Sequence, residues 1–170
     1  MESQDGAETT LRMPDAEDGP RVTALVAASP PLDTNSAYCN LLQCTDFRET
    51  CVVAERGGTL MGWVSAYRPP SAPHRLFIWQ VAIAADARGM GLAARMIREL
   101  LARPAASGVS EITTTITAGN AASWGLFRSL ARRFGADLTR SPRFEQAAHF
   151  GGHHDTEWEA RIAPLHLISE

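Results

Sequence analysis

The segment RGMGLA, residues 88–93, separates an apolar run typical of a strand from a run typical of a helix. The first turn of a helix leaves backbone N–H groups without partners, and the helix dipole adds about half a positive charge there. Glycines allow neighbouring amides to turn toward the same point without steric obstruction. The segment is therefore predicted to bind an anion such as a pyrophosphate. The structural alternative is ordinary turn chemistry.

Two common phosphate motifs do not fit this segment. It lacks the G-x-x-x-x-G-K-[ST] pattern of a P-loop, and it lacks the third glycine and the downstream acidic residue of a dinucleotide fingerprint. The pattern that it does contain is R-x-x-G-x-A, from Arg88 to Ala93.

The flanking patterns supply the strand and the helix that this segment requires. The run RLFIWQVAI, residues 75–83, is rich in aromatic and β-branched residues and suits the centre of a sheet. Downstream of Gly91, apolar residues recur at helical spacing until Pro104 ends the run. These residues are Leu92, Met96, Ile97, Leu100 and Leu101.

A second strand followed by a helix comes next in the chain. The run EITTTIT, residues 111–117, is predicted to be a central strand because Thr and Ile are stiff at χ1. Asn120 is expected to cap a helix that carries Trp124, Phe127 and Leu130 on one face. The run EWEARIA, residues 157–163, is predicted to be the last strand.

Strands and one helix are also expected in the first half of the chain. Two β-rich runs around Gly57 and Gly58 predict a hairpin, since paired glycines allow positive φ in a tight turn. The run RVTALVAA, residues 21–28, has the apolar content of a first strand. Asp33, Thr34 or Asn35 can cap a helix that follows. The predicted class is α+β, with α and β elements mixed.

Composition excludes several classes of function. The chain has 170 residues, 45% of them apolar, and a net charge of −3, which gives no basic face for nucleic acid. A single domain over residues 21–170 is expected, with residues 1–20 as a flexible acidic tail. No apolar stretch suits a membrane span or a secretory signal, so the expected location is the cytoplasm. Three cysteines without C-x-x-C spacing predict neither a disulfide nor a metal site.

The strand, the R-x-x-G-x-A segment and the run ITTTITAGNAASWGLF, residues 112–127, together resemble the GNAT superfamily of acyl-CoA-dependent N-acetyltransferases. The resemblance covers about residues 20–165. It implies the GNAT fold, a mostly antiparallel twisted sheet flanked by helices, and acetyl-CoA as cosubstrate. The strand that ends at Ile83 would pair with the pantetheine arm. The implied cofactor-binding residues are Val81, Ile83, Arg88, Gly89, Met90, Gly91, Leu92, Ala93, Asn120, Ser123 and Phe127.

Four segments narrow the resemblance to the L-2,4-diaminobutyrate acetyltransferases of ectoine biosynthesis. They are LDTNSAYCNLLQCTDF, WQVAI, TTTITAGNAASWGLF and HDTEWEARI. That family implies transfer of acetyl to the γ-amino group of 2,4-diaminobutyrate by a homodimer. The implied substrate-binding residues are Asp33, Asn35, Tyr38, Trp79, Thr115, His154 and Glu157.

Acetyl transfer to an amine requires a neutral nitrogen and a group that accepts its proton. Asp33 and Glu157 are the candidates to neutralise the substrate's ammonium groups and to pass on the proton. The backbone N–H of Val81 is the candidate donor to the tetrahedral oxyanion. Simpler structural roles stay open for the side chains: a helix cap for Asp33 and a solvated strand end for Glu157 and His154. Trp79 could equally be a core aromatic and Thr115 an ordinary strand residue.

One position departs from the family pattern. Many GNAT enzymes carry a tyrosine seven residues after the CoA-contacting asparagine, where it protonates the leaving thiolate, and this chain has Phe127 there. That role is therefore not assigned. Two other functions stay open: a GNAT enzyme for another small amine or a protein N-terminus, and a non-catalytic acyl-CoA-binding regulator.

Overall fold

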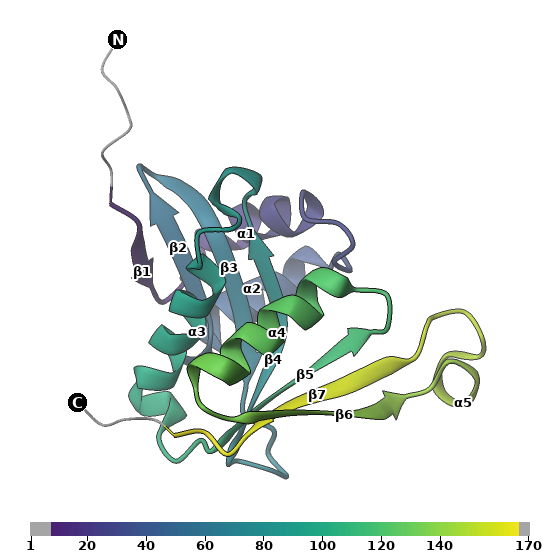
Figure 1. Ribbon diagram of the computed structural model, residues 1–170. Helices are drawn as coiled ribbons and strands as arrows, with labels where there is room; N and C mark the ends of the chain where they lie inside the picture. Colours follow the sequence, from purple (N-terminus) through teal and green to yellow (C-terminus); the bar gives the residue numbers. More distant parts are fainter. Residues whose placement is uncertain (1–7, 167–170) are drawn as a thin grey trace. The chain divides into compact units, whose positions relative to one another are not determined.

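The computed structural model describes residues 8–166 (Figure 1). Its packing divides the chain into two compact units. Of the described residues, unit 1 comprises 8–67 and 80–107, and unit 2 comprises 68–79 and 108–166. Strand β4 (Arg75–Ile83) belongs to both units, and hydrogen-bonded strands follow the order β1-β2-β3-β4-β5-β7-β6. Within residues 8–166, β4 pairs with β5 in parallel, whereas the pairs β1–β2, β2–β3, β5–β7 and β6–β7 are antiparallel. A mostly antiparallel sheet in a mixed α and β chain is thereby confirmed.

Unit 1 contains a meander of strands with helices on both faces. Its elements besides the second half of β4 are β1 (Thr10–Arg12), α1 (Asp18–Ala27), α2 (Ala37–Thr45), β2 (Val52–Arg56), β3 (Thr59–Tyr67) and α3 (Leu92–Ala102), with one-turn 3-10 helices η1 (Arg48–Thr50), η2 (Ala85–Ala87) and η3 (Pro104–Ala106). Gly57 and Gly58 have φ of +56° and +79° in the turn between β2 and β3, so the predicted hairpin is confirmed.

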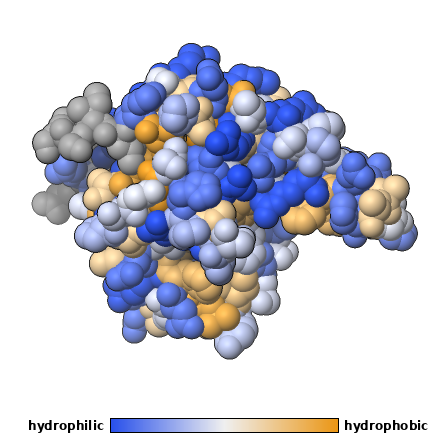
Figure 2. All heavy atoms as spheres, turned by 90° about the horizontal axis from the view of Figure 1, so that it is seen from below, coloured by the Kyte–Doolittle hydropathy of each residue, from blue (hydrophilic) through white to orange (hydrophobic). Residues whose placement is uncertain are grey.

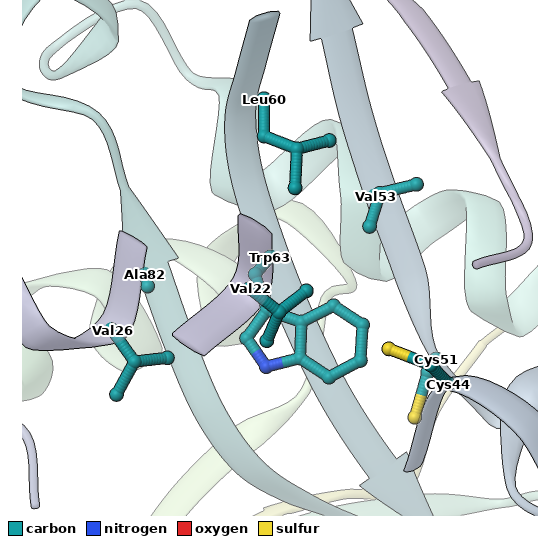
Figure 3. Close-up of a cluster of buried hydrophobic side chains, with 8 residues drawn as sticks. All are labelled: Val22, Val26, Cys44, Cys51, Val53, Leu60, Trp63 and Ala82. Carbon is teal, nitrogen blue, oxygen red and sulfur yellow. The ribbon is translucent and has the colours of Figure 1, made fainter. Parts of the chain in front are cut away.

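Neighbouring residues of β3 face opposite layers of unit 1. A Cβ on Gly62 would meet Met96 of α3, whereas Trp63 is fully buried in a cluster with Val22 and Val26 of α1. Figure 3 shows the Trp63 indole in the middle of that cluster, with Cys44 and Cys51 at its edge. Alternation of side chains across a strand thus gives one face to α3 and the other to α1 and α2.

Residues 21–27 lie in α1 and Ala28 is its C-cap, so the expected first strand is wrong. Val22 and Val26 recur at helical spacing and are both buried, with Leu25 packed against the same cluster. Both a strand and a helix fit so short an apolar run, and burial of one helical face decides between them.

The acidic segment also folds in part. Arg12 of β1 binds Asp18 at the start of α1 and Glu55 of β2, at 2.7 Å and 2.6 Å. The expected flexible tail therefore does not extend to residue 20, because ion pairing and strand pairing order residues 10–20. Residues 1–7 lie outside the described part of the chain.

Unit 2 is built from four strands and two helices. Besides the first half of β4 they are β5 (Glu111–Thr117), α4 (Ala121–Arg133), β6 (Asp137–Phe144), α5 (Gln146–Phe150) and β7 (Glu157–Ala163). The predicted strands at 75–83, 111–117 and 157–163 are confirmed. Strand β6 was not expected, because its residues are mostly exposed and include Pro142. Such a polar sequence is tolerated at a sheet edge, where β6 has β7 as its one neighbouring strand.

The hairpin of β6 and β7 carries α5 at its tip (Figure 1). There Phe144 and Phe150 make edge contacts at 6.4 Å between ring centroids, and Phe150 lies 4.5 Å from the ring of His154. At the right edge of Figure 2 this tip exposes both hydrophilic and hydrophobic residues. Nowhere in residues 8–166 is a helix both long and apolar enough to cross a membrane.

Candidate functional site

The backbone of residues 88–93 has the conformation that an anion site needs. Gly89 and Gly91 have φ of +76° and +73°, a region that residues with a Cβ rarely adopt. Gly91 is the N-cap of α3, and the first intrahelical bond runs from the Arg95 N–H to the Gly91 carbonyl. The amides of the preceding turn therefore lie at the positive end of the helix dipole.

Side chains of this segment separate into exposed and buried groups. Arg88 is exposed, and its Nε donates to the carbonyl of Ile83 at 3.1 Å, which ties the segment to the end of β4. Met90 is exposed, whereas Leu92 is buried beneath the first turn of α3. The structure thus ties residues 88–93 to Ile83, the last residue of β4.

Strand β4 connects this segment with a second group of predicted residues. Val81 lies two residues before Ile83, and the buried Gln80 precedes it. The Gln80 side chain donates to the Asp33 carbonyl at 2.7 Å and accepts from the Asn35 side chain at 3.0 Å. Asp33 and Asn35 are therefore brought to β4. Sequence reasoning missed Gln80, although a single polar residue in an apolar strand signals a buried polar contact.

The helix cap beside this segment is Ser36 rather than Asp33, Thr34 or Asn35. The Ser36 hydroxyl accepts from the Cys39 N–H at 3.1 Å. This correction leaves the exposed Asp33 carboxylate without a capping role. Tyr38, in the first turn of α2, is 70% exposed and can contact a ligand.

In unit 2 the predicted cofactor residues lie at the start of α4. The Asn120 side chain accepts from the Ser123 N–H at 3.1 Å, so the expected cap is confirmed and the Nδ2 group is the part that can donate to a ligand. The indole N–H of Trp124 donates to the Thr117 carbonyl at 3.1 Å and joins this helix to the end of β5. Phe127 is only 3% exposed and packs in the core.

Of the predicted substrate residues in unit 2, Trp79 lies on β4, Thr115 on β5 and Glu157 on β7, and His154 precedes β7. Thr115 pairs with Glu159, and Thr117 pairs with Glu157. His154 Nε2 lies 3.7 Å from a carboxylate oxygen of Glu157, so these two side chains are brought together. Trp79 is 46% exposed, which excludes the core alternative for this residue.

The pairing of β4 with β5 is short. The register runs from Arg75↔Glu111 to Phe77↔Thr113. Immediately beyond it, the buried hydroxyl of Thr114 donates to the Ile78 carbonyl at 2.8 Å. A side chain thus satisfies a carbonyl where the ladder ends, a role that the sequence alone did not suggest.

Among residues 8–166, no group of three or more His, Cys, Asp or Glu side chains is placed to hold a metal ion. The three cysteines are free thiols.

Comparison with known proteins decides the family. Residues 19–131 match the acetyltransferase (GNAT) family. The L-2,4-diaminobutyric acid acetyltransferase of Methylotuvimicrobium alcaliphilum is 45% identical over 94% of this chain and 92% of its own length. The chain belongs to the diaminobutyric acid acetyltransferases of the GNAT family. The member from Vibrio cholerae is 48% identical over 89% of this chain and 88% of its own length.

Solved structures agree with this family. Diaminobutyrate acetyltransferase EctA of Paenibacillus lautus, in complex with L-2,4-diaminobutyric acid and coenzyme A, superposes with a TM-score of 0.89 at 36% identity. The alignment covers 97% of this chain and all of that one. YncA of Salmonella typhimurium, solved with acetyl-CoA, has a TM-score of 0.70 at 17% identity and shows the GNAT fold alone.

Proposed function

We propose that this GNAT acetyltransferase transfers the acetyl group of acetyl-CoA to the γ-amino group of L-2,4-diaminobutyrate. The products are Nγ-acetyl-L-2,4-diaminobutyrate, an intermediate of ectoine biosynthesis, and coenzyme A. The observation that carries the proposal is the likeness, over nearly the whole chain, to the Paenibacillus lautus enzyme solved with diaminobutyric acid and coenzyme A.

The reaction forms one amide bond and breaks one thioester bond. The attacking amine must first lose a proton, because an amine with a pKa near 10.4 is only about 0.04% neutral at pH 7. The thiol of coenzyme A leaves as a thiolate without strong help from an acid, since ordinary thiols have a pKa near 8.5. The reaction therefore does not require a tyrosine at position 127 to protonate the leaving thiolate.

Each proposed residue has one part in this reaction. The amides of Met90 to Ala93 hold the pyrophosphate of acetyl-CoA, and Asn120 contacts the same cofactor. The Val81 N–H donates to the oxyanion of the tetrahedral intermediate. Asp33 and Glu157 neutralise the ammonium groups of the diamino acid, and one of them passes the proton of the γ-amine to water.

Regioselectivity sets a further requirement. The α-amine of the substrate is the more acidic one, near pKa 8 by the terminal-amine reference, and it would react first if both amines were free. Binding must therefore hold the α-ammonium and the α-carboxylate away from the thioester. Trp79, exposed on β4, is suited to cover an ammonium group by cation–π contact.

The test is thiol release from acetyl-CoA with the purified protein and a panel of amines. The panel contains 2,4-diaminobutyrate, ornithine, lysine, a peptide N-terminus and an aminoglycoside, and NMR identifies the acetylated nitrogen. We expect strong turnover of diaminobutyrate with acetylation at Nγ. Turnover of another amine but not of diaminobutyrate would reject diaminobutyrate as the substrate. Binding of coenzyme A without turnover of any amine would favour a non-catalytic acyl-CoA-binding regulator.

Variants assign the two carboxylates. Asp33→Asn and Glu157→Gln keep the size of each side chain and remove its charge. The variant that lacks the proton acceptor should have a kcat at least about a hundredfold lower than the wild type, because a general base typically contributes that much to the rate. A variant that raises only KM for diaminobutyrate identifies a binding role instead.

We also propose that the enzyme acts as a cytoplasmic homodimer, an expectation that rests on the family. Light scattering on the purified protein should give twice the chain mass of 18.4 kDa. A mass of one chain would reject the homodimer. Fractionation of the host cell tests the location.

A further inference from the structure

Gln80 interrupts an otherwise apolar stretch of β4, and its side chain is buried. A buried amide needs hydrogen-bond partners, because burial without them is costly. Both partners of Gln80 come from one short segment. Its Nε2 donates to the Asp33 carbonyl at 2.7 Å, and its Oε1 accepts from Asn35 Nδ2 at 3.0 Å.

The segment that Gln80 holds belongs to neither a helix nor a strand. Residues 33–36 precede α2, and Asp33 and Thr34 are exposed. The Ser36 cap fixes the end of the segment next to α2. The hydrogen bonds of the Gln80 side chain fix the part that carries the Asp33 carboxylate. Gln80 and Asp33 are 47 residues apart in the sequence.

The backbone at residue 80 has a separate hydrogen bond. The Gln80 N–H donates to the Ser65 hydroxyl on β3 at 3.1 Å. The position of β4 and the hold on residues 33–35 therefore depend on different groups of Gln80. Substitutions can remove one without the other.

We propose that Gln80 is a positioning residue for the diamino acid. Its side-chain amide holds residues 33–35 against β4 and thereby fixes where the Asp33 carboxylate is presented to the substrate. This inference rests on the proposed function. Affinity for diaminobutyrate should depend on the Gln80 side chain, whereas affinity for acetyl-CoA should not, because residues 88–93 are tied to β4 through Arg88 and Ile83 instead.

The test compares Gln80→Met with Ser65→Ala in the full chain. Methionine has a similar length and removes both hydrogen bonds to the segment, and Ser65→Ala removes only the bond to the Gln80 backbone. For Gln80→Met we expect KM for diaminobutyrate to rise about tenfold, with KM for acetyl-CoA changed less than about twofold. Ser65→Ala should leave both values within about twofold of the wild type.

Hydrogen exchange gives a readout that does not depend on turnover. In the free protein, amides of residues 32–36 should exchange faster in Gln80→Met and at the wild-type rate in Ser65→Ala. Unchanged exchange, or an equal rise of both KM values with a lowered Tm, would overturn the positioning role. Absence of diaminobutyrate turnover in the wild type would instead reject the proposed function, and the presentation of Asp33 to that substrate would fall with it.

Discussion

Gly91 has a backbone conformation that suits the proposed cofactor site. Its φ of +73° places the amides of the following helical turn at the end of the segment, and a Cβ there would meet no neighbouring atom within 4 Å. Backbone conformation is therefore the main structural reason for glycine at this position. The left-handed region costs residues with a Cβ about 1–2 kcal/mol.

Gly91→Ala should weaken the binding of acetyl-CoA more than it lowers the stability of the fold. Gly58, with φ of +79° and open space around it, supplies a control with the same backbone conformation far along the chain from the segment. Both Ala variants should lose about 1 kcal/mol in unfolding free energy. Only Gly91→Ala should raise KM for acetyl-CoA, by about tenfold, because the methyl group obstructs the anion. Equal KM values in the two variants would remove the segment from cofactor binding.

The reactivity of each cysteine depends on how deeply its thiol is buried. Burial raises the pKa of Cys44 and of Cys51 to about 12, and burial also raises the pKa of the half-buried Cys39. Thiolates are the reactive form. At pH 8 an aromatic disulfide reagent should titrate Cys39 in the native protein, and Cys44 and Cys51 only after unfolding. Rapid reaction of all three thiols in the native protein would contradict this burial.

At the scale of elements, charged side chains join segments that hydrophobic packing leaves at the edge. Asp18 is 1% exposed, and Arg12 and Arg21 bind it at 2.7 Å and 3.0 Å. Arg12 also binds Glu55, so that β1, α1 and β2 share one network. The short β1 has three residues and pairs with β2, and this network adds side-chain contacts to that pairing.

Asp18→Asn should lower the free energy of unfolding by about 2 kcal/mol, because the charges of Arg12 and Arg21 would lose the buried carboxylate that neutralises them. Thermal or denaturant unfolding measures the change. Asp46→Asn at the exposed C-cap of α2 is the control and should change stability by less than about 0.5 kcal/mol. A similar loss in both variants would show that the network has no special weight.

Thr114 defines where the β4–β5 ladder ends. Thr114→Val keeps the shape of the side chain and leaves the Ile78 carbonyl without its 2.8 Å hydrogen bond, whereas Thr114→Ser keeps the hydroxyl. Since the following residues of β4 are those expected to pair with pantetheine, we expect Thr114→Val to raise KM for acetyl-CoA about fivefold. Thr114→Ser should stay near the wild type in steady-state kinetics. If the serine variant loses as much as the valine variant, packing rather than the hydroxyl is responsible.

At the scale of the whole molecule, each unit contains a buried carboxylate between arginines. In unit 2, Glu111 accepts from Arg75 of β4 and from Arg161 of β7. Burial acts to raise the pKa of Glu111, but the hydrogen bonds and charges of Arg161 and Arg75 outweigh it and lower that pKa. For Asp18, burial is likewise outweighed by hydrogen bonds from Arg12 and the Asp15 amide, so its pKa is also lowered.

These two carboxylates predict how stability depends on pH. A lowered folded-state pKa means that the unfolded state binds protons more readily, so the stabilisation is complete above the unfolded pKa values, about 3.9 for Asp and 4.3 for Glu. It is lost as pH falls through the lower folded values. Denaturant unfolding from about pH 6 to pH 3 should therefore show a steep decline. The double variant Asp18→Asn, Glu111→Gln should start less stable and decline less, and parallel curves would contradict the assignment.

Features that depend on neighbouring residues could be predicted from the sequence. Glycine spacing and hydrophobic periodicity correctly placed the start of α3, the β2–β3 hairpin, the strands β4, β5 and β7, and the Asn120 cap. The tertiary structure decided what depends on distant partners. It made residues 21–27 part of a helix by burying one face, and it paired the polar β6 with β7. It also brought Gln80 to a segment 45 to 47 residues away, because only the folded chain brings such distant hydrogen-bonding groups together.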